Sequence, residues 1–236
     1  MKKLGVIGGM GPLAGAYFME LAIEMTDASS DAENIEMEVL SVPSIPDRTG
    51  FILGESDDSP VPKILKLRDK LIEDGCGVIA IPCNTAVYFK NEYLTKDETV
   101  ILNPIEETAL VLKKMGIRKA GIMATDGTMK AGLFTEELSK HGIEAVESDE
   151  AHQKLIMEMI YGCVKAGKPI PKEMMDKAAG HLRDKGAEVI VLGCTELSIA
   201  RKDGIAGDGF LDTLEVLAAS SVKACGAKLR KESVNI

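Results

Sequence analysis

The sequence contains no tryptophan, and its 236 residues include only four tyrosines and five phenylalanines. A hydrophobic core must therefore be built mainly from aliphatic side chains. No apolar stretch approaches the length of a membrane span, so we expect no transmembrane segment. With 45% hydrophobic and 28% charged residues, the composition is that of a globular protein. The length suits one domain or two small lobes of about 100 residues each.

The cysteines and histidines exclude two common kinds of site. There are five cysteines, an odd number, and no C-x-x-C pair, which argues against a disulfide framework. None of the three histidines (His141, His152 and His181) is adjacent to a cysteine, so we expect no zinc site and no other metal site. The phosphate-binding pattern G-x-x-x-x-G-K-[ST] is also absent.

The formal net charge of -9 argues against nucleic-acid binding, because an acidic surface repels phosphate backbones. It leaves room for a small anionic substrate in a local cationic pocket. At the N-terminus, Lys2 and Lys3 precede an apolar run that breaks at once into glycines, too short for a secretory signal. We therefore expect a cytoplasmic protein that binds neither nucleic acid nor a membrane.

Apolar runs separated by breakers predict strands that alternate with helices. The expected strands are Leu4–Ile7, Ile35–Val42, Val78–Ile81, Val100–Leu102, Lys119–Ala124, Ile143–Val146 and Val189–Leu192. The expected helices cover Leu13–Thr26, Pro62 to about Gly75, a segment with Phe134 and Leu138 on one face, Glu150–Ala166, Lys172–Lys185 and Asp212–Lys231. Residues 43–60, rich in Pro, Gly, Ser and Asp, predict a long functional or mobile loop. This alternation favours an α/β fold with parallel sheets covered by helices.

One strand pattern occurs twice. G-x-x-V-I-A-I-x-C ends at Cys83, and G-x-x-V-I-V-L-x-C ends at Cys194, 111 positions later (194 minus 83). Ligands of open α/β sheets bind beyond the carboxyl ends of the strands, which is where both cysteines stand. If the two halves form facing lobes, the two thiols meet across one cleft.

For the remaining cysteines, Cys76, Cys163 and Cys225, a buried and inert thiol is the expected state. Cys83 and Cys194 differ because each is followed by a short polar pair and lies near an expected helix N-terminus, which lowers the pKa of a thiol. Two thiols on opposite faces of one carbon suit a racemase without a cofactor. A thiolate removes the α-proton, and a thiol delivers a proton to the other face.

The stretches "VIGGMGP", "PCNTA" and "GCTEL" resemble the aspartate/glutamate racemase superfamily, and within it the PLP-independent aspartate racemases. The resemblance spans nearly the whole chain. Glutamate racemases typically carry D-S-G in place of the glycine-rich stretch and GCTH at the second cysteine, where this chain has Glu196. The resemblance implies two pseudo-symmetric Rossmann-like lobes and a cleft that closes over an acidic amino acid. It also implies Cys83 and Cys194 as the acid/base pair, no cofactor, and commonly a homodimer.

We assign residues 1–103 and 212–236 to the first lobe, which carries Cys83, and residues 104–211 to the second, which carries Cys194. The resemblance implies that the last helix packs back on the first lobe. The terminal "RKESVNI" is expected to be mobile.

The resemblance also implies roles for residues around the cysteines. Those that would line the site and hydrogen-bond the α-carboxylate or meet the amine of the substrate are Asn84, Thr85, Thr125 and Thr195. Arg48 is assigned to the second carboxylate, which a guanidinium binds bidentately. Lys165, in "YGCVKAG", resembles a lysine that contacts substrate, and Met10 and Gly11 form part of the pocket wall.

Plainer roles stay open for three of these residues. Arg48 also fits a solvated loop charge, and Lys165 a charge near a helix C-terminus. Glu196 either orients Cys194, binds the amino group, or only favours a helix N-terminus.

Other functions fit parts of the sequence. Gly9-x-Gly11-x-x-Ala14 matches a dinucleotide-binding fingerprint, but Pro12 removes a backbone donor and no acid follows the second strand to bind a ribose. The superfamily also leaves open glutamate or both acids as substrate, a maleate-isomerase-like reaction, and a non-catalytic small-molecule binding protein.

Overall fold

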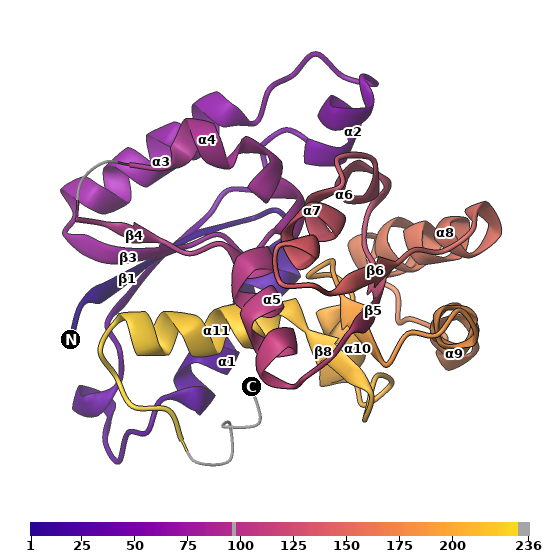
Figure 1. Cartoon of the computed structure of the whole chain (residues 1–236). Helices are drawn as coiled ribbons and strands as arrows, with labels where there is room; N and C mark the ends of the chain where they lie inside the picture. The colour runs from indigo at the N-terminus through magenta and orange to yellow at the C-terminus, as the bar shows by residue number, and fades with distance from the viewer. Residues whose placement is uncertain (96–97, 231–236) are drawn as a thin grey trace.

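Two four-stranded parallel sheets form the framework of the computed structural model, which describes residues 1–95 and 98–230 (Figure 1). The first sheet has the order β2-β1-β3-β4, with β1 at Lys3–Gly8, β2 at Met37–Ser41, β3 at Cys76–Ala80 and β4 at Val100–Ile101. The second has the equivalent order β6-β5-β7-β8, with β5 at Lys119–Met123, β6 at Glu144–Val146, β7 at Val189–Leu192 and β8 at Phe210–Asp212. The predicted α/β class and its two similar lobes are confirmed.

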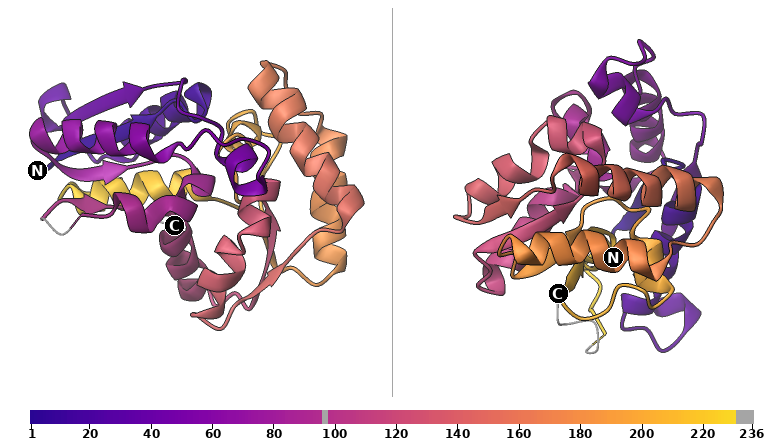
Figure 2. Two further views of the ribbon diagram at one scale, coloured as in Figure 1. Left: turned by 90° about the horizontal axis from the view of Figure 1, so that it is seen from above. Right: turned by 90° about the vertical axis from the view of Figure 1, so that its right-hand side faces the viewer.

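Helices cover both sheets (Figure 2). Around the first sheet lie α1 (Pro12–Met25), α2 (Arg48–Leu53), α3 (Val61–Glu73) and α4 (Lys90–Tyr93). The later helices are α5 (Pro104–Lys114), α6 (Asp126–Lys130), α7 (Leu133–Ser139), α8 (Glu150–Met157), α9 (Lys172–Asp184), α10 (Ser198–Lys202) and α11 (Thr213–Ala224). Short 3₁₀ segments are η1 (Asp31–Glu33), η2 (Asn84–Phe89) and η4 (Val164–Ala166), and η3 (Glu158–Cys163) is a π-helix. None of the described helices is long and apolar enough to cross a membrane.

The turn from β1 into α1 depends on a glycine and a proline. Gly9 has a φ of +97°, and a Cβ atom there would lie 2.4 Å from the Val42 carbonyl carbon, so only glycine fits against the end of β2. Pro12 occupies the first turn of α1, where its missing N–H costs nothing. The expected helix start is therefore correct within a residue.

The chain returns to the first sheet at its end. Helix α11 follows β8 of the second sheet, yet Leu214 and Leu217 belong to the same core as Leu4, Val6 and Phe18 of β1 and α1. Figure 1 shows α11, in yellow, beside α1 under the first sheet. The packing expected for this helix is present, while the exact division of the chain into lobes stays a prediction.

Three expectations about helices need correction. The expected loop 43–60 contains α2, which begins because the Asp47 side chain accepts a hydrogen bond from Gly50 N and ends at Gly54, whose φ is +77°. The helix expected through Ala166 is an α-helix only to Met157 and continues as η3 and η4. Helix α11 ends at Ala224, and the left-handed Gly226 follows it. Residues 231–236, most of the expected mobile tail, lie outside the described residues.

A buried carboxyl group stands where β8 passes into α11. Asp212 is fully buried, and its Oδ1 accepts hydrogen bonds from Ser198 Oγ (2.6 Å) and Leu214 N (2.8 Å). Its Oδ2 has no hydrogen-bond partner among the described residues. Burial is the main cause that raises the pKa of Asp212 to about 7, although the Ser198 hydroxyl opposes the shift.

We expect Asp212→Asn to stabilise the protein more at pH 8 than at pH 5. The folded carboxyl stays protonated up to about pH 7, whereas the unfolded one ionises near 3.8, so the wild type loses stability as the pH rises between these values. Asparagine keeps an acceptor oxygen for Ser198 and Leu214 but does not titrate. Urea unfolding of both proteins should show a difference between the two pH values of about 2–3 kcal/mol. A pH-independent difference would contradict this assignment.

Candidate active site

Hydrogen bonds between the two lobes bring the segments around Cys83 and Cys194 together. Thr195, directly after Cys194, donates from its Oγ1 to the carbonyl oxygen of Pro82, directly before Cys83 (3.3 Å). Asn84, directly after Cys83, donates from Nδ2 to Thr213 Oγ1 (2.7 Å). Thr213 in turn donates to the carbonyl oxygen of Leu192 at the end of β7 (2.9 Å). All of these side chains are buried, so the carboxyl ends of β3 and β7 meet at one place.

Cys83 lies beside a buried guanidinium. Arg48, only 6% exposed, donates from Nη2 to the Met10 carbonyl (2.8 Å) and from Nη1 to the Pro46 carbonyl (3.0 Å). Burial opposes its charge, but the neighbouring Cys83 thiol, which hydrogen-bonds with it, and the Asp47 carboxylate raise the pKa of Arg48. The structure therefore does not support a solvated loop charge for Arg48.

The third nitrogen of the Arg48 guanidinium, Nε, is buried and makes no hydrogen bond within the described part of the chain. An unpaired buried donor costs free energy unless a ligand or water satisfies it. A carboxylate bound here would provide the missing acceptor.

Cys194 lies beside a buried carboxylate instead. Its Sγ donates to Glu196 Oε2 at 2.9 Å. Burial first, and then the charge and hydrogen bond of Glu196, raise the pKa of Cys194 well above its ordinary value, although Lys165 opposes the shift. The second oxygen, Oε1, has no partner among the described residues and would lie 3.0 Å from a Cβ on Gly11. Glu196 lies two residues before α10 begins at Ser198, and its carboxylate is hydrogen-bonded to Cys194.

Lys165 reaches the same region from η4. Its Nζ lies 3.9 Å from the centre of the Tyr161 ring and 3.6 Å from Asp47 Oδ2. Burial lowers the pKa of Lys165, but Glu196 and its other anionic neighbours outweigh this and raise it. The sequence reasoning did not single out Tyr161 or Asp47. Tyr161 stands four residues before Lys165 in the quoted "YGCVKAG", a spacing that places two residues on one face of a helix.

Three threonine hydroxyls form a closed group. Thr85 Oγ1 lies 3.1 Å from Thr125 Oγ1 and 2.9 Å from Thr128 Oγ1, and the last two are 3.0 Å apart. All three residues are buried. Thr125 and Thr128 stand at the start of α6 in the second lobe, and Thr85 stands in η2 of the first. The sequence reasoning missed Thr128, although the spacing in "TDGT" matches the cap-to-N3 distance of a helix start.

A cavity of about 530 Å³ opens beside these groups. The predicted site residues that line it are Met10, Arg48, Lys165 and Glu196, together with Gly11 and Asp47. Cys83 and Cys194 are 5% and 6% exposed and do not line the cavity, but each contacts one lining residue, Arg48 or Glu196. Arg48 therefore links the cavity to Cys83, and Glu196 links the same cavity to Cys194.

The glycine-rich turn lines the same cavity but does not suit a dinucleotide. The space beside Gly9 is filled by the backbone of Val42, and Glu196 approaches Gly11. A carboxylate at that position repels a pyrophosphate.

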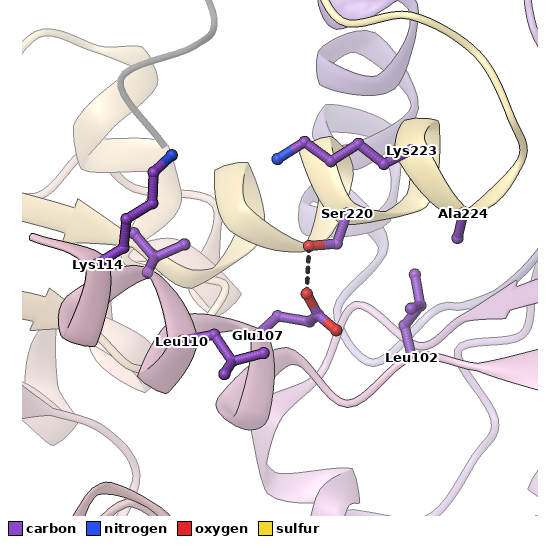
Figure 3. A pocket seen from close by; sticks show the side chains of 8 residues that line it. Leu102, Glu107, Leu110, Lys114, Ser220, Lys223 and Ala224 are labelled. Atoms are coloured by element: carbon purple, nitrogen blue, oxygen red, sulfur yellow. Dashed lines mark hydrogen bonds between the residues drawn. The ribbon is translucent and has the colours of Figure 1, made fainter. Parts of the chain in front are cut away.

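A second cavity, of about 450 Å³, lies between α5 and α11 (Figure 3). The hydrogen bond drawn in the figure runs from Ser220 Oγ to Glu107 Oε2 and is 2.7 Å long. None of the cysteines or other predicted site residues lines it, so the cavity beside Arg48 is the candidate active site.

Comparison with known proteins shows which family the chain resembles. Residues 7–220 match the family described as Asp/Glu/Hydantoin racemase. The chain is 25% identical to the broad specificity amino-acid racemase RacX of Bacillus subtilis, over 93% of this chain and 96% of that one. The Picrophilus torridus aspartate racemase structure is similar with a TM-score of 0.84 and 30% identity, covering 100% and 99% of the two chains. A Francisella tularensis glutamate racemase shares the fold alone, with 16% identity, a TM-score of 0.63, and coverage of 94% and 79%.

We expect Glu196→Gln to make Cys194 more reactive. Glutamine can still accept the thiol hydrogen bond but lacks the charge that raises the pKa of Cys194. Each pKa unit regained increases the thiolate fraction about tenfold, so alkylation by iodoacetamide at pH 8 should accelerate by about that factor. Peptide mass spectrometry measures the rate, with Cys225 as internal control because its pKa of about 11 arises from burial elsewhere. An unchanged rate at Cys194 would contradict the role of Glu196.

Proposed function

Because the chain belongs to the Asp/Glu/Hydantoin racemase family, we propose that it interconverts L- and D-aspartate without a cofactor, using Cys83 and Cys194 as the proton-transferring pair. The observation that carries the proposal is the bond from Thr195 to the Pro82 carbonyl. It joins the residue after one cysteine to the residue before the other, which is the arrangement needed to flank one substrate carbon.

The reaction is a balanced exchange of protons. One thiolate takes the α-proton, so that the Cα–H bond breaks and an S–H bond forms. The opposite thiol gives its proton to the other face of Cα and becomes a thiolate. The intermediate carries negative charge on the α-carboxylate, which preorganised donors stabilise in a site without bulk water. The reverse reaction exchanges the roles of the two sulfurs.

The two thiols differ in the charge beside them. The Arg48 guanidinium lies beside Cys83, whereas Cys194 lies beside the Glu196 carboxylate, which adds to the effect of burial in raising the pKa of Cys194. We therefore assign the removal of the α-proton to Cys83 and the delivery of a proton to Cys194. The enantiomer whose α-proton faces Cys83 reacts in this way. The other enantiomer requires the two sulfurs to exchange roles.

Unused hydrogen-bonding atoms mark where the substrate binds. Arg48 Nε donates to the side-chain carboxylate. The hydroxyls of Thr85 and Thr125, which are hydrogen-bonded to each other and to Thr128, turn out of that group to donate to the α-carboxylate. Asn84 Oδ1, buried and without a partner among the described residues, accepts from the substrate ammonium group. Lys165 adds positive charge at the cavity wall and offsets the second negative charge of the substrate.

Aspartate is the preferred substrate in this proposal, supported by the likeness to the Picrophilus torridus aspartate racemase and by "GGMGP" and "GCTEL". The similarity to RacX supports a broader range of amino acids as the second candidate. The homodimer and the cytoplasmic location stay predictions.

The direct test is incubation of the purified protein with L-aspartate, and separately with L-glutamate, under reducing conditions and without added cofactor. We expect D-aspartate to form faster than D-glutamate, as measured by chiral chromatography. Equal rates would support the broad-range candidate instead. If neither acid is racemised, binding of aspartate without turnover would favour a binding protein, and a cysteine adduct with maleate would favour an isomerase.

We expect Cys83→Ala and Cys194→Ala each to reduce racemisation by at least about 10²–10⁴-fold, the usual contribution of a positioned acid or base. The two variants should differ in deuterium oxide. Each variant keeps one sulfur and should therefore exchange the α-proton of at most one enantiomer, a different one in each variant. Proton NMR of both aspartate enantiomers measures the exchange. Full two-way turnover by either variant, or exchange of both enantiomers by one variant, would refute the thiol pair.

A further inference from the structure

Two of the three histidines lie against each other, away from the candidate active site. His152 in α8 and His181 in α9, 29 positions apart (181 minus 152), have parallel rings with centres 3.9 Å apart and an interplanar angle of 7°. The Asp149 carboxylate contacts both. Its Oδ1 is 2.7 Å from His152 Nδ1, and its Oδ2 is 3.8 Å from His181 Nε2.

We propose that Asp149, His152 and His181 bind a divalent transition-metal ion of the zinc type, with water completing its coordination. Imidazole nitrogens and a carboxylate oxygen are ligands that Zn²⁺ takes in proteins. One such atom from each residue lies within 4.8 Å of the others. No cysteine is part of the group.

To hold an ion, the group must give up two hydrogen bonds, one between His152 Nδ1 and Asp149 Oδ1 (2.7 Å) and one from Asp149 N to His181 Nε2 (3.3 Å). Ligand atoms of a tetrahedral zinc ion lie roughly 3.4 Å apart, given metal–ligand bonds of about 2.0–2.2 Å. The observed 2.7 Å from Asp149 Oδ1 to His152 Nδ1 and 3.8 Å from Asp149 Oδ2 to His181 Nε2 fall on either side of this value, so the carboxylate must also turn to present one oxygen to the ion. Because a metal ion lies in the plane of each imidazole it binds, one ring must tilt out of the parallel stack. Binding therefore has a structural signature, the loss of ring stacking.

The surroundings allow a cation to enter. The side chains of His152 and His181 are 20% and 18% exposed, and that of Asp149 is 53% exposed. The neighbouring lysines are already engaged, because Lys154 pairs with Glu150 and Lys185 donates to the Glu147 carbonyl. The net charge of -9 also attracts cations.

The ion has a structural role at this position. It joins the start of α8 to the last turn of α9, which lie side by side in the second lobe (Figure 1; Figure 2). Helix α8 leads into η3 and η4, which carry Tyr161 and Lys165 to the active-site cavity. The bound ion therefore braces one wall of that cavity without touching the substrate.

The test is a calorimetric titration of the full chain, freed of metal by a chelator, with zinc chloride under reducing conditions. We expect one saturable site in the wild type. His152→Gln and His181→Gln should each weaken binding by more than the roughly tenfold lost with an outer-shell partner. His141→Gln is the matched control, because His141 pairs with Glu137 but has no second histidine beside it, and it should not change binding.

The variant Asp149→Asn separates metal binding from folding. Asparagine can still accept the capping hydrogen bond from His152 N at the start of α8, but it brings no charge to the ion. The variant should weaken binding while the thermal unfolding of the metal-free protein stays unchanged. A dissociation constant weaker than about 100 μM in the wild type would overturn the proposal. Binding that survives the double variant His152→Gln/His181→Gln would also overturn it, and would place the ion on the cysteine thiols.

Discussion

The candidate active site depends on two buried polar links between the lobes, next to the cysteines. One runs from Thr195 to the Pro82 carbonyl, and the other runs from Asn84 through Thr213 to the Leu192 carbonyl. Each is made of buried groups, so breaking it would leave a donor or acceptor unpaired away from water. Because these links hold the carboxyl ends of β3 and β7 together, two sequence-distant thiols share one site. This explains why the strand–cysteine pattern occurs twice in the sequence, because each lobe contributes one strand end and one sulfur.

The two lobes have similar folds, but the charges beside their sulfurs are opposite. Cys83 has a guanidinium next to it and Cys194 a carboxylate, both nearly excluded from water. At low local dielectric these two charges matter more than they would on the surface. Similar lobes thus provide similar positions for the thiols, while Arg48 and Glu196 place opposite charges beside them. In the proposed reaction one sulfur removes a proton and the other delivers one.

Much of this was predictable from the sequence. Apolar runs predicted seven of the eight strands in the described residues, and the repeated pattern predicted that Cys83 and Cys194 each follow a strand. Both features depend on neighbouring residues, which is why a local pattern reveals them. The helix α2 inside a polar loop was not predictable, since it depends on a side-chain cap at Asp47. Nor was the contact between His152 and His181. The expectation of no metal site considered only spacing in the sequence, whereas the packing of α8 on α9 brings the two rings together.

The central claim, that two bases act on opposite faces of one carbon, is tested most directly by following L-aspartate in deuterium oxide at early times. Mass spectrometry after chiral separation would report deuterium separately in the remaining substrate and in the product. The account predicts that D-aspartate carries deuterium at Cα while the remaining L-aspartate does not, because the proton removed by one thiol is not the proton delivered by the other. D-aspartate that keeps the original proton, or equal labelling of both enantiomers from the start, would contradict it.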